Sequence, residues 1–328
     1  IVKYIQEIYF LYGNSCQESK QMDIKIEVGK RIRMLREMKH ITRETLCDDE
    51  TEITVRQLAR IESGQSSPSL SKVEYIAYKL GCSISHIVDM DHMILPSEYL
   101  ILKDKLIKFQ TYGDDDRIQV KEELFERVYE HYYDSLPEDE QIAVSALQAS
   151  FDVFVSEDAG FGDALLDEYF EQVKIRKNYS VNDLLLIKLY FVSCLARPIG
   201  YNHELFWMLS KKLIRETNSS DLETAYMLKR TVLDSLAVQW MEKSYSTFEP
   251  YVKAMNTLMI LSQDFQNKPI VDMLEAMCTL FHKRDKEKAI RLYDRAIICA
   301  QAFGDQVLEA RILGEKEKDI KTFEEMES

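Results

Sequence analysis

Arg56, Gln57 and Arg60 lie close together in one short segment and carry side chains suited to base recognition. Arginine can donate two hydrogen bonds to the O6 and N7 atoms of guanine, and glutamine can bind N6 and N7 of adenine. Thr54 with Gln57 three residues later is a capping-box pattern that predicts the start of a helix, and Gly64 predicts its end. On spacing alone, a solvated helix face explains the two arginines equally well.

The sequence contains no pattern typical of catalysis or metal binding. It has no GxxxxGK loop and no GxGxxG, HExxH or GxSxG motif, and its six histidines are isolated. The cysteines form no CxxC pair, which favours free thiols in a reducing cytosol over disulfides or a zinc finger. They are Cys16, Cys47, Cys82, Cys194, Cys278 and Cys299. We therefore expect no enzyme activity, no cofactor and no metal.

The composition predicts an all-α protein. Only 10 glycines and 6 prolines occur in 328 residues, and this scarcity of helix breakers favours long helices. No apolar run reaches the ~18–20 residues of a membrane span, so no membrane contact is expected. The scattered free thiols favour a cytoplasmic protein. The net charge is −14, but residues 22–90 balance 11 basic with 11 acidic side chains. The acidic excess lies in residues 91–328, so nucleic-acid binding would need a local basic face.

The first 21 residues are unrelated to the rest of the chain. They start with Ile1, lack a basic segment before the apolar stretch and lack a small-residue cleavage site, so they do not resemble a signal peptide. Met22 directly precedes the first periodic segment. We expect translation to start at Met22 and residues 1–21 to be a non-native upstream extension.

The residues around the Arg56–Arg60 segment predict a domain of five short helices over 22–90. We expect helices at 28–39, 43–47, 54–62 and 69–80 and a short one at 84–88. This order, with R-Q-L-A-R-I-E-S-G from residue 56 and I-A-Y-K-L-G from residue 76, resembles the phage-repressor-like (XRE) helix-turn-helix domain.

The resemblance implies that helix 54–62 enters the major groove of double-stranded DNA. Arg56, Gln57 and Arg60 would then read bases, and a second group of residues would hold phosphates. The second group is Thr54, Ser66, Ser69 and Arg43. It also implies a buried salt bridge between Arg36 and Glu62. The acidic stretch 48–52 departs from the family pattern and should penalise non-specific DNA binding by repelling phosphates.

The remaining residues, 97–328 after a linker at 91–96, predict a helical array. Helix pairs beginning near 97, 138, 181, 221 and 269 give a loose repeat of about 40–48 residues with a capping helix, and 286–300 resembles the second helix of a tetratricopeptide (TPR) repeat. Such solenoids form concave grooves for extended peptides. Tyr112, Phe191, Tyr226 and Trp240 are candidate groove residues, although core packing explains each of them as well. The array could also serve only for dimerisation.

The combination of these two parts resembles the peptide-pheromone receptors of Gram-positive bacteria (the Rgg, PlcR and PrgX group), and most closely the ComR branch of competence regulators. The resemblance runs from about 22 to 313. It rests on Arg43-Glu44, Leu46-Cys47, Thr54–Leu58, Arg60–Glu62, Pro68–Leu70, Leu106–Phe109, Thr111-Tyr112, Leu136–Glu138 and Asn182–Leu185. It implies that an imported short hydrophobic peptide binds the array, near Thr111 and Lys121, and frees the DNA-binding domain. Gly113 stands where a relative carries a basic residue, which predicts a different peptide.

The same resemblance implies a homodimer on an inverted-repeat promoter that activates transcription, with RNA polymerase as a further partner. Glu138, Asp139 and Glu140 could hold the basic helix through Arg56 or Arg60 while no peptide is bound. Two other functions stay open: a phage-type or toxin–antitoxin repressor whose helical part only dimerises, and a protein-interaction regulator with a vestigial helix-turn-helix.

Overall fold

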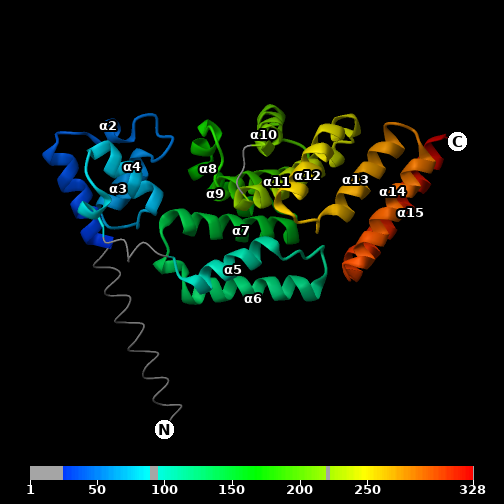
Figure 1. Cartoon of the computed structure of the whole chain (residues 1–328), viewed down its shortest axis with the longest axis horizontal. Helices are drawn as coiled ribbons and strands as arrows, with labels where there is room; N and C mark the ends of the chain where they lie inside the picture. Colours follow the sequence, from blue (N-terminus) through cyan, green and yellow to red (C-terminus); the bar gives the residue numbers. More distant parts are fainter. Residues whose placement is uncertain (1–24, 89–94, 219–221, 328) are drawn as a thin grey trace, which may run out of the picture. The chain divides into compact units, whose positions relative to one another are not determined.

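The computed structural model describes residues 25–88, 95–218 and 222–327, and these residues are helical with no strand (Figure 1). The predicted extension 1–21 and most of the predicted linker 91–96 lie outside them. No helix among the described residues has both the length and the apolar character needed to cross a membrane.

The N-terminal part has the five-element order that the sequence predicts. Residues 25–38 are helical and precede the four elements α2 (Arg43–Cys47), α3 (Val55–Glu62), α4 (Leu70–Leu80) and the 3-10 turn η1 (Ile84–His86). Ile32, Leu58 and Ile76 are fully buried at the centre of a single apolar core. Burial of one apolar stripe from each short helix supplies the stability that helices of this length lack in isolation.

Among the described residues, the α-helices of the C-terminal part form five pairs followed by one last helix, which confirms the predicted TPR-like array. Each pair begins within about one residue of its predicted position. The pairs are α5 (Ser97–Lys108) with α6 (Asp115–His131), α7 (Glu138–Ser156) with α8 (Gly160–Ile175), α9 (Val181–Ala196) with α10 (His203–Arg215), α11 (Leu222–Met241) with α12 (Phe248–Ser262), and α13 (Lys268–Phe281) with α14 (Lys286–Ala302), followed by α15 (Gln306–Glu327).

The described chain divides into two compact units whose limits fall after α5 and within α6 and α7, while the boundary at 91–96 between the two sequence domains stays a prediction. The first unit joins the N-terminal helices to α5, the end of α6 and the start of α7, and the second holds residues 109–121 and everything from 146 onward. The start of α7 belongs with the first unit because its acidic side chains pair with residues of α3 and α4.

Gly29 is the residue that lets helix 25–38 approach α3. A Cβ at this position would lie 2.1 Å from the backbone carbonyl oxygen of Ile61. Because that neighbour is backbone, it cannot rotate away as a flexible side chain would. Only hydrogen fits between the two helices.

We expect Gly29→Ala to lower the free energy of unfolding of the first unit by about 1–3 kcal/mol, since overpacking forces the two helices apart. The midpoint of urea unfolding followed by circular dichroism measures this. Gly314→Ala is the matched control: nothing lies within 4 Å of its Cβ position in α15, so it should stabilise the chain by about 0.5–1 kcal/mol. Equal effects of the two substitutions would contradict the proposed packing.

Candidate nucleic-acid interface and ligand site

The start of α3 is fixed by a capping box between Thr54 and Gln57. The amide of Gln57 donates to Thr54 Oγ1 and the amide of Thr54 donates to Gln57 Oε1, both at 3.1 Å. Two otherwise unsatisfied backbone donors are thereby bonded. Arg56 is exposed on the same helix, whereas Gln57 is only 4% exposed. Arg56 is thus accessible for base contact in this conformation and Gln57 is covered.

Glu62, at the end of α3, forms ion pairs with two arginines. Arg36 donates Nε to Glu62 Oε1 at 2.6 Å and Nη2 to Oε2 at 3.0 Å, and Arg43 donates Nε to Oε2 at 2.8 Å. Arg36 also donates to the carbonyl of Ile41. The hydrogen bond to Glu62 raises the pKa of Arg36 above its ordinary value. A buried carboxylate with two cationic partners has its desolvation cost offset by strong charge-assisted bonds.

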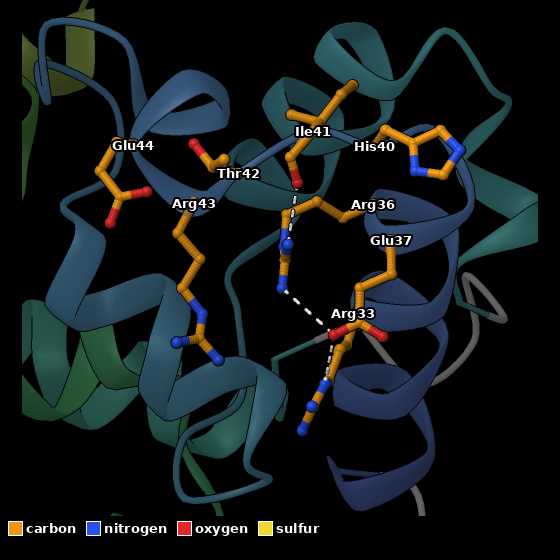
Figure 2. A pocket seen from close by; sticks show the side chains of 8 residues that line it. All are labelled: Arg33, Arg36, Glu37, His40, Ile41, Thr42, Arg43 and Glu44. Carbon is orange, nitrogen blue, oxygen red and sulfur yellow. Dashed lines mark hydrogen bonds and ion pairs between the residues drawn. The ribbon is translucent and has the colours of Figure 1, made fainter.

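An open pocket lies where helix 25–38 meets α2, and Figure 2 shows the side chains around it. Arg36 reaches the Glu37 carboxylate from above in this view and Arg33 reaches it from below, while Arg43 extends from the start of α2 on the opposite side of the pocket. Arg43 is held by Glu62 yet remains about one-third exposed, which suits contact with a DNA phosphate. Arg43 was identified from the sequence as a candidate phosphate contact, but the pocket was not identified. Its lining is Arg33, Arg36, Glu37, His40, Ile41, Thr42, Arg43 and Glu44.

The first turn of α7 places carboxylates on the groups expected to face DNA. Glu138 Oε1 accepts a hydrogen bond from Arg60 Nη1 at 2.7 Å. Asp139 accepts from Ser69 Oγ at 2.5 Å and from Lys72 Nζ. The backbone is joined as well, because the amide of Glu138 donates to the carbonyl of Ser67 at 3.1 Å. We call Glu138 and Asp139 together the acidic cover.

The acidic cover is mostly removed from solvent. The side chains of Glu138 and Lys72 are each 6% exposed, and that of Arg60 is 23% exposed. Ser66 is also buried, and its Oγ, like Glu138 Oε2, lacks a hydrogen-bond partner within the described residues. The predicted base reader Arg60, the predicted phosphate contact Ser69 and the neighbouring Lys72 are therefore bonded to carboxylates. The other predicted phosphate contact, Ser66, is buried. Lys72 was not identified as a site residue from the sequence, because there it resembles any surface lysine on a helix.

Glu140, the third acidic residue predicted to hold the basic helix, bonds to α5. It accepts from the hydroxyl of Tyr99 at 2.6 Å and from Lys103 Nζ at 2.7 Å. Burial and the neighbouring carboxylate raise the pKa of Tyr99, so the hydroxyl stays a donor. Glu140 thus anchors the first turn of α7 to α5, and this anchoring presents the acidic cover.

Lys121 in the second unit is a half-buried cation. Its Nζ donates to the carbonyl of Phe109 at 3.0 Å and lies 5.8 Å from the ring centre of Phe151. Burial, with the nearby charges of Lys188 and Arg230, lowers its pKa to about 7. An ammonium that is destabilised in this way gains strongly from an added carboxylate.

The other predicted ligand residues divide between surface and core. Tyr112, Tyr226 and Trp240 are half-buried, and each ring lies within 6 Å of a cation, while Thr111 is buried. Phe191 is fully buried and packs edge-on against Phe206. The expectation that Phe191 faces a ligand is therefore corrected: its ring fills the core between α9 and α10.

Both parts of the chain match known protein families. The ComR tetratricopeptide family model matches residues 96–316, and a helix-turn-helix model matches residues 32–87. ComR from Streptococcus suis is 34% identical and covers 90% of this chain and 96% of its own, with a TM-score of 0.75. No curated protein is significantly similar in sequence.

Two solved structures of ComR from S. thermophilus are also similar. The apo form is 36% identical, covering 90% of this chain and 99% of that one, with a TM-score of 0.76. The complex with DNA and the signalling peptide ComS is 37% identical over 89% and 99%, with a TM-score of 0.64.

A repressor-like helix-turn-helix followed by a TPR-like array defines a class of transcription regulators, not of enzymes. The family-model match over most of the array and the 34–37% identities over about nine tenths of the chain identify it further. The chain belongs to the ComR family.

We expect Glu62→Ala to lower the free energy of unfolding by about 3–5 kcal/mol, because it leaves the buried Arg36 charge without its partner. Glu37→Ala, which removes the exposed partner of Arg33 and a longer 3.8 Å contact with Arg36, should cost at most about 1 kcal/mol. Urea unfolding of both variants measures the difference. If Glu62→Ala were no more destabilising than Glu37→Ala, Glu62 would not organise the domain.

Proposed function

We propose that this chain is a peptide-gated transcription regulator that binds an inverted-repeat promoter as a dimer once a short hydrophobic peptide occupies its second unit. The proposal rests above all on the acidic cover. Glu138 and Asp139 occupy Arg60, Ser69 and Lys72. We propose the cytoplasm as the site of action and RNA polymerase as the further partner.

The acidic cover and DNA compete for the same donors. A carboxylate on Arg60 takes the place that a guanine edge would take, and Asp139 takes the place of a backbone phosphate between Ser69 and Lys72. One group cannot serve both partners at once, so release of the cover must precede specific binding. Each partly buried ion pair contributes a modest free energy, and together the pairs bias the equilibrium toward the covered state by a few kcal/mol.

The family supports the proposed ligands. ComR from S. thermophilus has been crystallised with DNA and its signalling peptide ComS. For this chain we propose Arg56, Gln57 and Arg60 as base readers and Thr54, Arg43, Ser66 and Ser69 as phosphate contacts. Thr111, Tyr112, Lys121, Tyr226 and Trp240 are the proposed peptide contacts. A constitutive repressor, the alternative, has no need for carboxylates on its reading helix.

The substitution Glu138→Ala should raise DNA binding in the absence of peptide by about tenfold, corresponding to the loss of about 1.4 kcal/mol of restraint on Arg60. Fluorescence anisotropy on a labelled inverted-repeat promoter measures it. Glu130→Ala is the matched control, since Glu130 is an exposed carboxylate of α6 in the same unit.

Equal basal affinity of the Glu138→Ala variant and the unchanged protein would contradict the gate. Tight binding by the unchanged protein, unaffected by any peptide, would favour the constitutive repressor instead.

Lys121 makes the affinity for a peptide with a free C-terminus depend on pH. Below its pKa of about 7 the side chain carries a proton and attracts a carboxylate. Above that pH the free protein loses the charge, so binding requires proton uptake. The dissociation constant should therefore rise about tenfold between pH 6 and pH 8. Fluorescence anisotropy measures the dissociation constant of an activating double-tryptophan peptide at each pH. In the Lys121→Met variant the dissociation constant should not depend on pH. A dissociation constant that does not depend on pH in the unchanged protein would exclude this role of Lys121.

A further inference from the structure

Three cations from three helices converge on one short segment of the second unit, residues 109–113. Lys121 of α6 donates to the carbonyl of Phe109, Arg230 of α11 donates to the side-chain oxygen of Gln110, and Arg311 of α15 donates to the carbonyl of Gly113. Each therefore bonds to a neutral oxygen. Among the ion pairs of the described residues, none involves Lys121, Arg230 or Arg311.

The neighbouring cations differ, because they have carboxylate partners. Lys188 pairs with Asp234 at 2.9 Å, and Arg117 pairs with Asp305 at 2.8 Å. Asp234 is therefore already bonded to Lys188, and among the described residues neither Lys121 nor Arg230 has a carboxylate partner. Their two positive charges form a local excess that is bonded to neutral oxygens.

This excess is buried, which makes it costly in the free protein. Arg230 is 8% exposed and Lys121 is half-buried. Neutral oxygens compensate a desolvated cation only in part, and a buried charge without a counter-charge is destabilising. A site built in this way gains most from a ligand that supplies two negative charges.

We propose that the ligand is an acidic peptide, one that carries an aspartate or glutamate side chain near its C-terminus in addition to the terminal carboxylate. The proposal rests on the proposed peptide-sensing function and specifies its ligand. A terminal carboxylate supplies one charge to the Lys121–Arg230 pair, and an acidic side chain supplies the second. Arg311, exposed beside Gly113, provides a further cation for the same side chain.

The geometry at Gly113 supports a role for Arg311. Gly113 has a φ of +73°, which residues other than glycine rarely adopt, and a Cβ there would lie 3.3 Å from Arg311 Nη2. The absence of a side chain at position 113 thus leaves room for the guanidinium to lie against this segment. Residues 109–113 contain no cation, so the positive charge beside Gly113 is supplied by Arg311 of α15.

The test uses the full chain and a defined mixture of synthetic heptapeptides, each with two adjacent tryptophans and random residues at the last three positions. One half of the mixture has free C-termini and the other half is amidated. Peptides retained by the protein on a size-exclusion column are identified by mass spectrometry. A charge-assisted hydrogen bond changes affinity by about tenfold, so we expect free-acid peptides with an acidic residue among the last three to be enriched about fivefold or more.

Lys121→Met should abolish the preference for free C-termini, and Arg311→Met should reduce the preference for acidic side chains. Lys288→Met, which removes an exposed lysine of α14 in the same unit, should leave both unchanged. Retention of neutral and acidic peptides alike would overturn the inference while leaving the peptide-gated function intact. Retention of no peptide would overturn the inference as well, and the Glu138→Ala variant then decides separately whether the gate exists.

Discussion

The partly buried contact between Arg60 and Glu138 is the interaction on which the proposed gate depends. The Glu138 side chain is 6% exposed, and a carboxylate buried to this extent is stable in its charged form only if a cation or strong donor compensates it. Arg60 supplies that compensation, and the same guanidinium is needed for DNA. A side chain required by two mutually exclusive partners is the simplest physical basis for a gate.

The surrounding residues keep this contact in place. Glu140 ties the first turn of α7 to Tyr99 and Lys103 of α5, so the acidic cover is presented by a braced helix end. The capping box of Thr54 and Gln57 fixes the start of α3, and Glu62 fixes its end through two arginines. α7 begins in the first compact unit and ends in the second. The helix that carries the acidic cover is therefore continuous with the unit proposed to bind the peptide.

Local patterns predicted most of the fold and only part of the site. Caps, breaks and apolar periodicity predicted helix starts at Thr54 and near residues 138 and 181, because these signals act within a few residues. Roles that depend on long-range packing were not predictable. Phe191 has a side chain of the kind expected in a groove, but it lies in the core. Lys72 was not a candidate in the sequence, because only the folded chain brings it to Asp139. The charge excess around Arg230 likewise exists only once segments more than a hundred residues apart are assembled.

The most direct test is amide hydrogen exchange at Glu138, whose backbone donates to the carbonyl of Ser67 in the covered state. Exchange is measured at residue resolution for the free protein and for the protein saturated with promoter DNA and an activating peptide. If DNA and the acidic cover exclude each other, the Glu138 amide loses its acceptor and exchanges faster in the complex, as expected for a first-turn amide without a partner. Unchanged or slower exchange at Glu138 in the DNA complex would contradict the gate.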